Sequence, residues 1–314
     1  MKNKKLKVLL ILLMLILATG CTKTLEDSET KKAVTNPSTG QSLTENILCR
    51  PKDEETLKLY EEHEVNLEQL PECEDFKINS GGYEGLWNTI FVKPLAFVIL
   101  QIGQFVKNYG LAIIITSLLI RLIAYPITKK TAVQSELIKE AKPELDKLEK
   151  KYANKTDQQS MMKKSQEMTM IYKKYNINPI SGCVYAMLQL PLFIAFLEAI
   201  NRVPALFEGT FLTLQMGTSP YIAIANSDFQ YIILILLVGI TTYFSFKLNS
   251  TSASNDQSKM TSRIMVIMIL VMSVFMTSAL NIYWITTNLF TVAQNLLVKK
   301  GGKKDEKLQV SRKK

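Results

Sequence analysis

The 314-residue sequence has a single histidine, His63, and none of the glycine-rich motifs that cradle phosphate groups. A nucleophilic enzyme needs a base beside its serine or cysteine, and neither Ser181 nor Cys183 has a histidine near it in the sequence. His63 itself stands among glutamates, without a further cluster of metal ligands. We therefore expect no catalytic residues, no cofactor and no bound metal.

Acidic residues are missing from the apolar core of every long hydrophobic stretch. Five stretches of roughly membrane-spanning length follow one another from Tyr109, and they cover residues 109–128, 181–200, 229–248, 264–280 and 281–298. The last two are contiguous, so residues 277–281 should form a tight exterior turn. A net charge of +10 beside a mean hydropathy of +0.09 requires charged and apolar residues to occupy separate parts of the chain. The sequence predicts an all-α membrane protein with five transmembrane helices.

The first 21 residues have a lysine-rich start, a short apolar core and small residues before Cys21, which is the layout of a secretory signal. The ending LATGC resembles a bacterial lipobox, although Ala18 stands where leucine is usual. Cys21 would then be the lipidated first residue of the mature protein. The alternative is an uncleaved N-terminal anchor with an incidental cysteine, and in both cases residue 22 starts outside the cell.

Residues 22–85 should form an exterior acidic segment that is partly disordered. Residues 22–86 hold fifteen acidic and seven basic side chains and few large apolar ones. Cys49 and Cys73 lie within the segment and could pair in an oxidising exterior. Free or metal-binding thiols are the alternative, although no further cluster of ligands supports a metal.

Charge decides the orientation of the ambiguous segment 86–106, which is nearly long enough to span. Residues 129–174 carry twelve lysines against seven acids, and the tail 299–314 carries eight basic residues against two. Both should be cytoplasmic by the positive-inside rule. An exterior start then needs an odd number of crossings before residue 129, and the span 109–128 supplies one. We therefore expect 86–106 to lie flat on the outer surface as an amphipathic helix.

The cytoplasmic segment 129–175 should form a helical hairpin, because the sequence ANKTD at 153–157 interrupts two helix-forming stretches. Its expected packing positions are Val133, Leu137, Leu145, Leu148, Met161, Met168, Ile171 and Tyr172. A solvated spacer is the alternative. Lysines on both arms favour docking on ribosomal RNA, lipid headgroups or partner proteins.

Polar side chains recur on one face of several spans. In the last span this face consists of Asn281, Trp284, Asn288, Thr291 and Asn295. Because buried amides without partners are costly in hydrocarbon, such a face should meet water or polar groups. Ser117, Arg121 and Tyr125 stack one turn apart in the first span, and Gln189 lies in the second. We predict an unpaired Arg121 charge in a hydrated cavity formed by spans one, two and five, with snorkelling to the cytoplasmic headgroups as the alternative.

The fourth span carries methionines on one face, at positions 265, 268, 272 and 276. This stripe favours helix packing, and the alternative is a pliable apolar surface for varied hydrophobic partners.

The segments YKKYNINPISGC at 172–183 and LQLPLFIAF at 188–196 follow each other in an order that resembles the YidC/Oxa family of membrane protein insertases. IRLIAYP at 120–126 and IYWITTNLF at 282–290 are similar to the first and last core spans of that family. The resemblance covers residues 86–298, and the lipoprotein-type start suggests its Gram-positive branch. One departure is TSALN at 277–281, where relatives commonly have a proline and a glycine.

The resemblance implies a hydrophilic groove that is open to the cytoplasm and the lipid but closed outside. Arg121 would be the groove arginine, and Gln189 and the Asn288 face would supply its polar wall. Tyr283 and Trp284 would be an aromatic pair near the outer end.

The function implied is the movement of nascent transmembrane segments from the cytoplasm into the bilayer, without nucleotide hydrolysis. The expected partners are nascent membrane proteins, lipid and the ribosome, which would dock on the tail 299–314 and the hairpin, with the Sec translocon left open and no DNA. The protein should be a multi-pass protein of the bacterial plasma membrane, with a lipid-anchored exterior N-terminus and a cytoplasmic C-terminus. The alternative is a small-anion transporter with Arg121 as counter-charge, but such folds usually show repeated halves that this sequence lacks.

Overall fold

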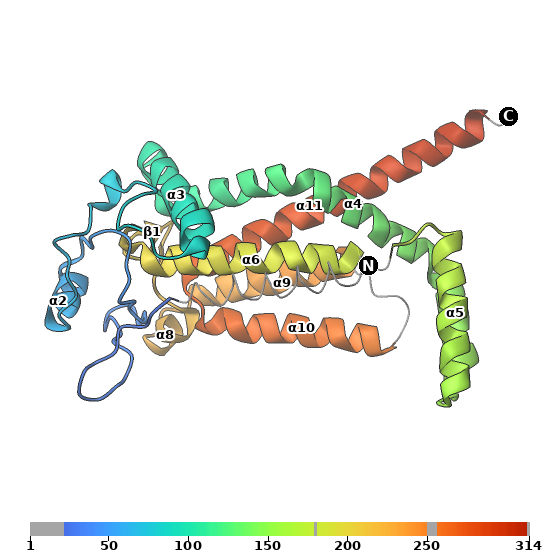
Figure 1. Ribbon diagram of the computed structural model, residues 1–314, viewed down its shortest axis with the longest axis horizontal. Helices are drawn as coiled ribbons and strands as arrows, with labels where there is room; N and C mark the ends of the chain where they lie inside the picture. The colour runs from blue at the N-terminus through green and yellow to red at the C-terminus, as the bar shows by residue number, and fades with distance from the viewer. Residues whose placement is uncertain (1–21, 179–180, 250–255, 313–314) are drawn as a thin grey trace. The chain divides into compact units, whose positions relative to one another are not determined.

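The computed structural model describes residues 22–178, 181–249 and 256–312, so the predicted signal segment and the lipidation site Cys21 lie outside the described residues. The described chain is predominantly helical, with one two-stranded antiparallel hairpin (Figure 1). In chain order the elements are α2 (Glu54–Glu62), η1 (Cys73–Asp75), η2 (Asn88–Val92), α3 (Lys93–Val106), α4 (Tyr109–Tyr152), α5 (Gln158–Lys174), α6 (Ser181–Arg202), α7 (Pro204–Phe207), β1 (Thr210–Phe211), β2 (Leu214–Gln215), α8 (Pro220–Ala225), α9 (Tyr231–Asn249), α10 (Asp256–Phe275) and α11 (Ser278–Arg312).

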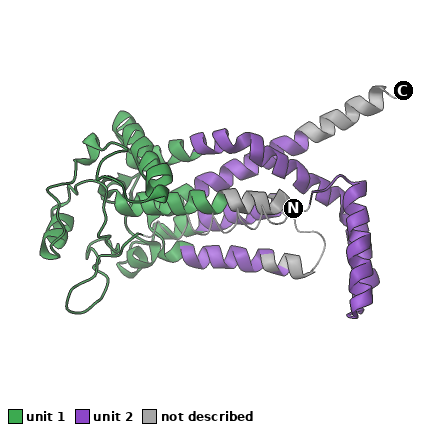
Figure 2. Cartoon of the chain, in the orientation of Figure 1, with its two compact units in different colours: residues 1–117, 189–235, 273–284 green, residues 118–188, 236–272, 285–314 purple. Residues whose placement is uncertain are grey.

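The chain forms two compact units (Figure 2). Unit 1 consists of Met1–Ser117, Gln189–Ile235 and Ser273–Trp284, and unit 2 consists of Leu118–Leu188, Leu236–Met272 and Ile285–Lys314. Each long apolar helix from α4 onward, except α5, therefore has residues in both units.

The N-terminal segment of unit 1 is folded, which differs from the expectation of partial disorder. Short β-bridges pair Glu26 with Ala33 and Thr35 with Ser42, and they bring distant apolar side chains together. The resulting small core consists of Leu25, Val34, Leu43, Ile47, Tyr60 and Leu67. Composition alone underestimates how ordered this segment is, because its few apolar residues are concentrated in one cluster.

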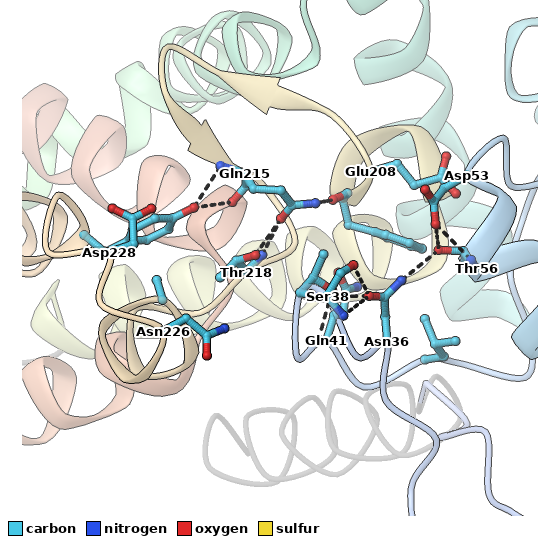
Figure 3. Close-up of a pocket in the computed structure, with 15 residues that line it drawn as sticks. Asn36, Ser38, Gln41, Asp53, Thr56, Glu208, Gln215, Thr218, Asn226 and Asp228 are labelled. Atoms are coloured by element: carbon cyan, nitrogen blue, oxygen red, sulfur yellow. Dashed lines mark hydrogen bonds between the residues drawn. The ribbon is translucent and has the colours of Figure 1, made fainter.

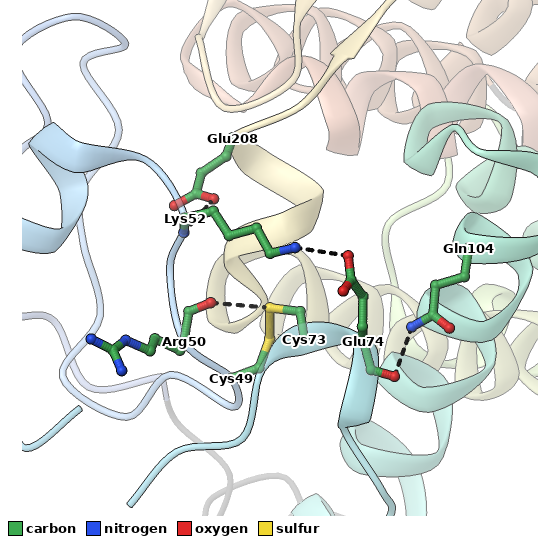
Figure 4. The surroundings of a disulfide bond; sticks show 7 residues. All are labelled: Cys49, Arg50, Lys52, Cys73, Glu74, Gln104 and Glu208. Carbon is green, nitrogen blue, oxygen red and sulfur yellow. Dashed lines mark hydrogen bonds and ion pairs between the residues drawn. A yellow bond between two sulfur atoms is a disulfide. The ribbon is translucent and has the colours of Figure 1, made fainter. Parts of the chain in front are cut away.

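A disulfide joins Cys49 to Cys73 and settles the pairing that the sequence left open (Figure 4). Both cysteines are buried. The Lys52 ammonium pairs with Glu74 at 2.7 Å, and the Gln104 side chain of α3 donates to the Glu74 carbonyl at 2.9 Å. The disulfide loop is thus attached to the helix that follows it.

Helix α3 continues directly from the π-helical turn η2, and the polar residues of this segment bond inside unit 1. The Lys93 ammonium donates to the carbonyl oxygens of Ser80 at 2.8 Å and Gly82 at 2.6 Å. Ile90 and Phe105 are exposed on the same segment. This distribution is amphipathic, while its flat placement on the outer surface stays a prediction.

Helix α4 runs through both Pro126 and Pro143 without a break, so the first predicted span and the first hairpin arm form one helix of 44 residues. It ends at Tyr152, and the Asp157 side chain accepts from the Ser160 backbone N–H to start α5. The break predicted at 153–157 therefore coincides with the observed one.

The second half of α4 and helix α5 pack against each other in unit 2. Their core contains Ile138, Ala141, Leu145 and Ile177, with Leu137, Met168, Ile171 and Tyr172 packed against it. Three ion pairs, Lys151–Glu167, Lys164–Glu149 and Lys174–Glu144, connect the two arms. Two of the predicted packing positions, Val133 and Met161, are instead exposed.

By length and composition, three helices among the described residues could cross a membrane: Asn88–Val106, Tyr109–Tyr152 and Tyr231–Leu248. Ser262–Phe275 is a shorter apolar helix. The first of the three is the segment that the charge distribution assigns to the outer surface, because length and composition do not distinguish a span from an interfacial helix.

The turn before α11 lies at residues 276 and 277, earlier than the predicted 277–281. The backbone N–H and hydroxyl of Ser278 donate to the Thr218 carbonyl at 3.0 and 2.8 Å, and the Ala279 N–H donates to the Met216 carbonyl at 3.0 Å. These carbonyls satisfy N–H groups that a helix start leaves free. Helix α11 can therefore begin at Ser278 without a proline or glycine.

Candidate functional site

The part of helix α11 in unit 2 has polar side chains inside and leucines outside. Thr291 and Asn295 are buried, whereas Leu289 and Leu297 are exposed, the latter at 62%. A soluble helix shows the opposite distribution. This arrangement fits a helix whose outer face meets lipid.

Hydrogen bonds hold these polar side chains in place. The Thr291 hydroxyl donates to the Thr287 carbonyl, and the Asn295 amide donates to the Thr291 carbonyl, both at 2.8 Å. The half-buried Asn288 donates to the Thr242 hydroxyl of α9 at 2.9 Å. Asn295 Oδ1 is buried without a hydrogen-bond partner among the described residues.

Arg121 lies in the part of α4 that belongs to unit 2, and only 5% of it is exposed. It has an interaction partner, so its side chain is not isolated, and its location in a hydrated cavity stays a prediction. A guanidinium carries five N–H donors and stays protonated, so burial demands such partners. Tyr125 is half-buried one turn further on.

Helices α4 and α11 are joined by a buried hydrogen bond in unit 2. The Thr128 hydroxyl, two turns after Arg121, donates to Gln294 Oε1 at 3.0 Å. The sequence analysis did not identify Thr128, Gln294 or Thr242. The available signal was the same for all three, namely a polar residue inside an apolar stretch.

Gln189, Tyr283 and Trp284 come together in unit 1. The Gln189 amide donates to the Tyr283 hydroxyl at 3.4 Å, and the Tyr283 ring stacks on Phe196 with centroids 4.1 Å apart. The Trp284 ring meets Phe193 edge-on at 5.2 Å. An aromatic and amide cluster thus lines α6 and the start of α11.

Ser117 is buried in unit 1, and its hydroxyl donates to the Ile113 carbonyl of its own helix at 2.6 Å. The predicted site residues are therefore divided. Unit 1 holds Ser117, Gln189, Tyr283 and Trp284, and unit 2 holds Arg121, Tyr125, Asn288, Thr291 and Asn295.

The methionine stripe of α10 is exposed rather than packed. Met265, Met268 and Met272 are each about two-fifths exposed. This contradicts the packing role that the sequence favoured and leaves a pliable apolar surface on that helix.

A buried charge cluster at the end of α6 was also missed. Arg202 is fully buried, and its guanidinium pairs with Glu84 and donates to Asn88 Oδ1 at 2.8 Å and to the Asn46 carbonyl at 2.6 Å. Nearby, the Trp87 ring N–H donates to Glu198 at 2.9 Å. No local pattern predicts these contacts, because the partners are more than 100 residues apart in sequence.

Comparison with known proteins adds a family relationship. Residues 101–306 match the family described as "60Kd inner membrane protein". "Membrane protein insertase YidC" of Oceanobacillus iheyensis is 38% identical over 226 residues, covering 69% of this chain and 85% of that protein. "Membrane protein insertase MisCA" of Bacillus subtilis is 34% identical over 216 residues, covering 68% of this chain and 79% of that protein.

Among solved structures, "Active YidC insertase crystal structure with the first transmembrane domain resolved" is 20% identical with a TM-score of 0.47. That similarity covers 76% of this chain and 52% of the solved chain, so this chain spans about half its length. The N-terminal segment 22–85 lies outside the region that matches the family.

Proposed function

The chain belongs to the YidC family of membrane protein insertases, and from this premise we propose that it inserts nascent transmembrane segments into the bilayer through a hydrophilic groove. The groove would be lined by Arg121, Asn288 and the other polar residues of the spans. The observation that supports it most is the inverted polarity of α11, with Thr291 and Asn295 buried and Leu297 exposed. A helix that only anchored the protein would have no need of a buried amide and hydroxyl face.

In the proposed mechanism a nascent span enters from the cytoplasm while its polar or acidic exterior flank is held near Arg121. A permanent cation with several donors suits a carboxylate. Polar walls shorten the apolar barrier that this flank must cross. The apolar part of the client then passes α9 and α11 into lipid, driven by hydrophobic partitioning, and the membrane potential assists acidic flanks. This mechanism uses no nucleotide.

The proposed topology has a lipidated Cys21 and residues 22–106 outside, five spans, and the hairpin and the tail 299–314 inside. The lysines of both cytoplasmic parts support docking of the ribosome. The exposed methionines of α10 support an adaptable surface for apolar clients.

The test is depletion of the native protein followed by site-specific crosslinking from position 288 to nascent clients. Matched single-span clients with acidic or neutral exterior flanks are compared in the native protein and in Arg121→Ala and Arg121→Lys variants. We expect Arg121→Ala to reduce insertion of the acidic-flank client at least tenfold more than that of the neutral one, with substantial rescue by Arg121→Lys.

Equal loss for both clients, or none for either, would count against an electrostatic role of Arg121. A complete absence of crosslinks to nascent chains would contradict the insertase function. It would favour the small-anion transporter, which uses the arginine without contacting clients.

A further inference from the structure

Unit 1 contains a cavity of about 390 Å³ that includes none of the predicted groove residues (Figure 3). Its walls come from two separate parts of the chain, residues 36–56 of the N-terminal segment and residues 207–231 between α6 and α9. The volume lies within the range of small-molecule sites, roughly 300–1,000 Å³. The insertase mechanism makes no use of this cavity.

Three buried polar atoms of the cavity wall lack hydrogen-bond partners among the described residues. Gln41 is 5% exposed, and neither its amide nitrogen nor its amide oxygen has a hydrogen-bond partner among the described residues. The same holds for the buried oxygen Oε1 of Glu208. Leaving such groups buried and unpaired is unfavourable, so they call for a ligand or water.

Oxygen atoms converge beside Gly217. A Cβ atom at this position would lie 2.4 Å from Gln41 Oε1, 2.7 Å from the Phe207 carbonyl oxygen and 3.3 Å from Gln215 Oε1. Any residue other than glycine would fill this space. The Phe207 carbonyl already accepts from the Gln215 amide, and Gln215 Oε1 accepts from Thr218. The glycine therefore leaves space beside one acceptor without a hydrogen-bond partner among the described residues, Gln41 Oε1.

The rest of the wall is fixed by its own hydrogen bonds. Asn36 Oδ1 accepts from the backbone N–H groups of Ser38 and Thr39, while its amide donates to the Thr56 hydroxyl at 3.1 Å. The Gln215 amide donates to the Phe207 carbonyl at 2.7 Å. Such preorganisation lowers the entropy cost of binding.

The charge of the wall selects the kind of ligand. Three carboxylates line the cavity, from Asp53, Glu208 and Asp228, and no lysine or arginine is among its described lining residues. Figure 3 shows the side chains of Glu208 and Asp53 next to one another. Anions are excluded by this charge, and a metal ion is disfavoured because the described residues contain no group of three or more metal-ligating side chains.

We propose that this cavity binds a primary ammonium group that carries a second hydrogen-bond donor on a short chain. The ammonium faces the carboxylates of Glu208 and Asp53, and the second donor reaches Gln41 Oε1 beside Gly217. The buried residues Phe207 and Tyr231 also line the cavity. A free diamine and a lysine side chain of another protein segment share this chemistry.

The experiment measures binding by calorimetry to the full-length protein in lipid nanodiscs at neutral pH. The probes are 1,5-diaminopentane, 5-amino-1-pentanol and 1,5-pentanediol, which have similar size but two, one or no ammonium groups. We expect both amines to bind and the diol to bind at least tenfold more weakly. N-acetyl-lysine amide serves as the peptide arm, so binding of this probe identifies a lysine source, and binding of the free amines alone identifies a small amine.

Variants make the test specific. Glu208→Gln keeps the shape of the side chain and its acceptor for the Lys52 N–H, and we expect it to weaken amine binding at least tenfold. Gly217→Ala should abolish binding, because its Cβ atom would fill the space beside Gln41 Oε1. The control is Glu62→Gln, which removes an exposed carboxylate of α2. Equal binding of the diol, no binding of any amine, or equal affinities of Glu208→Gln and Glu62→Gln would overturn the proposal. None of these outcomes bears on client insertion.

Discussion

The burial of the Glu208 carboxylate lowers the stability of the folded protein. Burial raises the pKa of the Glu208 carboxyl, and the nearby Asp53 adds to the effect, while the backbone N–H groups of Lys52 and Asp53 oppose it. A carboxyl whose pKa is higher in the folded than in the unfolded state favours its protonated form on folding. Stability is therefore lost as the pH rises through the interval between the two pKa values.

The prediction is that Glu208→Gln raises the midpoint of thermal unfolding at pH 8 by a few degrees, because the neutral amide avoids this loss. The gain should shrink as the pH falls from above the raised pKa of Glu208 to the ordinary glutamate pKa of about 4.3, and it should be absent below that, where the native carboxyl is protonated in both states. Thermal unfolding of both proteins in nanodiscs across this pH range is the measurement. A variant that is less stable at every pH would show that the attraction between the carboxylate charge and the N–H groups of Lys52 and Asp53 outweighs the cost of burial.

At the same scale, the sequence could predict which residues line the polar faces but not what they contact. Helical periodicity was sufficient to find Asn288, Thr291 and Asn295, because spacing alone places them on one face. It could not find Arg202, whose partners lie more than 100 residues away. Arg121 was identified by its chemistry, yet its interaction partner could not be inferred from the sequence.

At the scale of elements, the disulfide between Cys49 and Cys73 holds together a segment with a small core. Closing a loop with a sequence separation of 24 restricts the unfolded chain and stabilises by about 3 kcal/mol. The apolar cluster of six buried residues in the same segment contributes little further stability.

We therefore predict that a Cys49→Ser, Cys73→Ser double variant exposes residues 22–85 to protease far faster than the native protein. Limited proteolysis with and without reductant measures this, and cleavage should be confined to the N-terminal segment. The Glu62→Gln protein serves as the control for a substitution in the same segment. Unchanged cleavage rates after the disulfide is removed would mean that the apolar cluster suffices by itself.

Helices with a clear periodicity of apolar residues could be predicted from the sequence. Helix ends that depend on contacts with residues far away in the sequence could not. The hairpin positions Leu145 and Ile171 pack as their spacing requires. The start of α11 at Ser278 depends on carbonyls of residues 216–218, so the local sequence TSALN could not reveal it.

At the scale of the whole molecule, location in a membrane follows from hydropathy and charge. Both are averaged over many residues, so an error at a few positions does not change the prediction. The family relationship supports the same conclusion independently. The orientation across the membrane depends on where the basic residues lie, and the tail contributes eight of them.

Removing residues 303–314 takes away six basic side chains, and we expect this to weaken ribosome binding severalfold with less effect on client crosslinking from position 288. Contacts with phosphates weaken steeply with salt, so the native protein should lose binding faster than the truncated one as salt increases. Co-sedimentation with ribosomes is the measurement, and a tail in which these basic residues are replaced by glutamine controls for length. A tail-less protein that binds ribosomes normally would refute the assignment.

The contacts between the N-terminal segment and the end of α6 have a consequence for the timing of biosynthesis. The Lys52 N–H donates to Glu208, and the Asn46 carbonyl accepts from Arg202. In each case the partner lies 156 residues later in the sequence and is translated that much later. At about 5–20 residues per second the ribosome takes roughly 8–30 s to deliver them. The N-terminal segment is therefore synthesised well before its partners Glu208 and Arg202. During that interval it lacks these contacts and depends on protection from degradation.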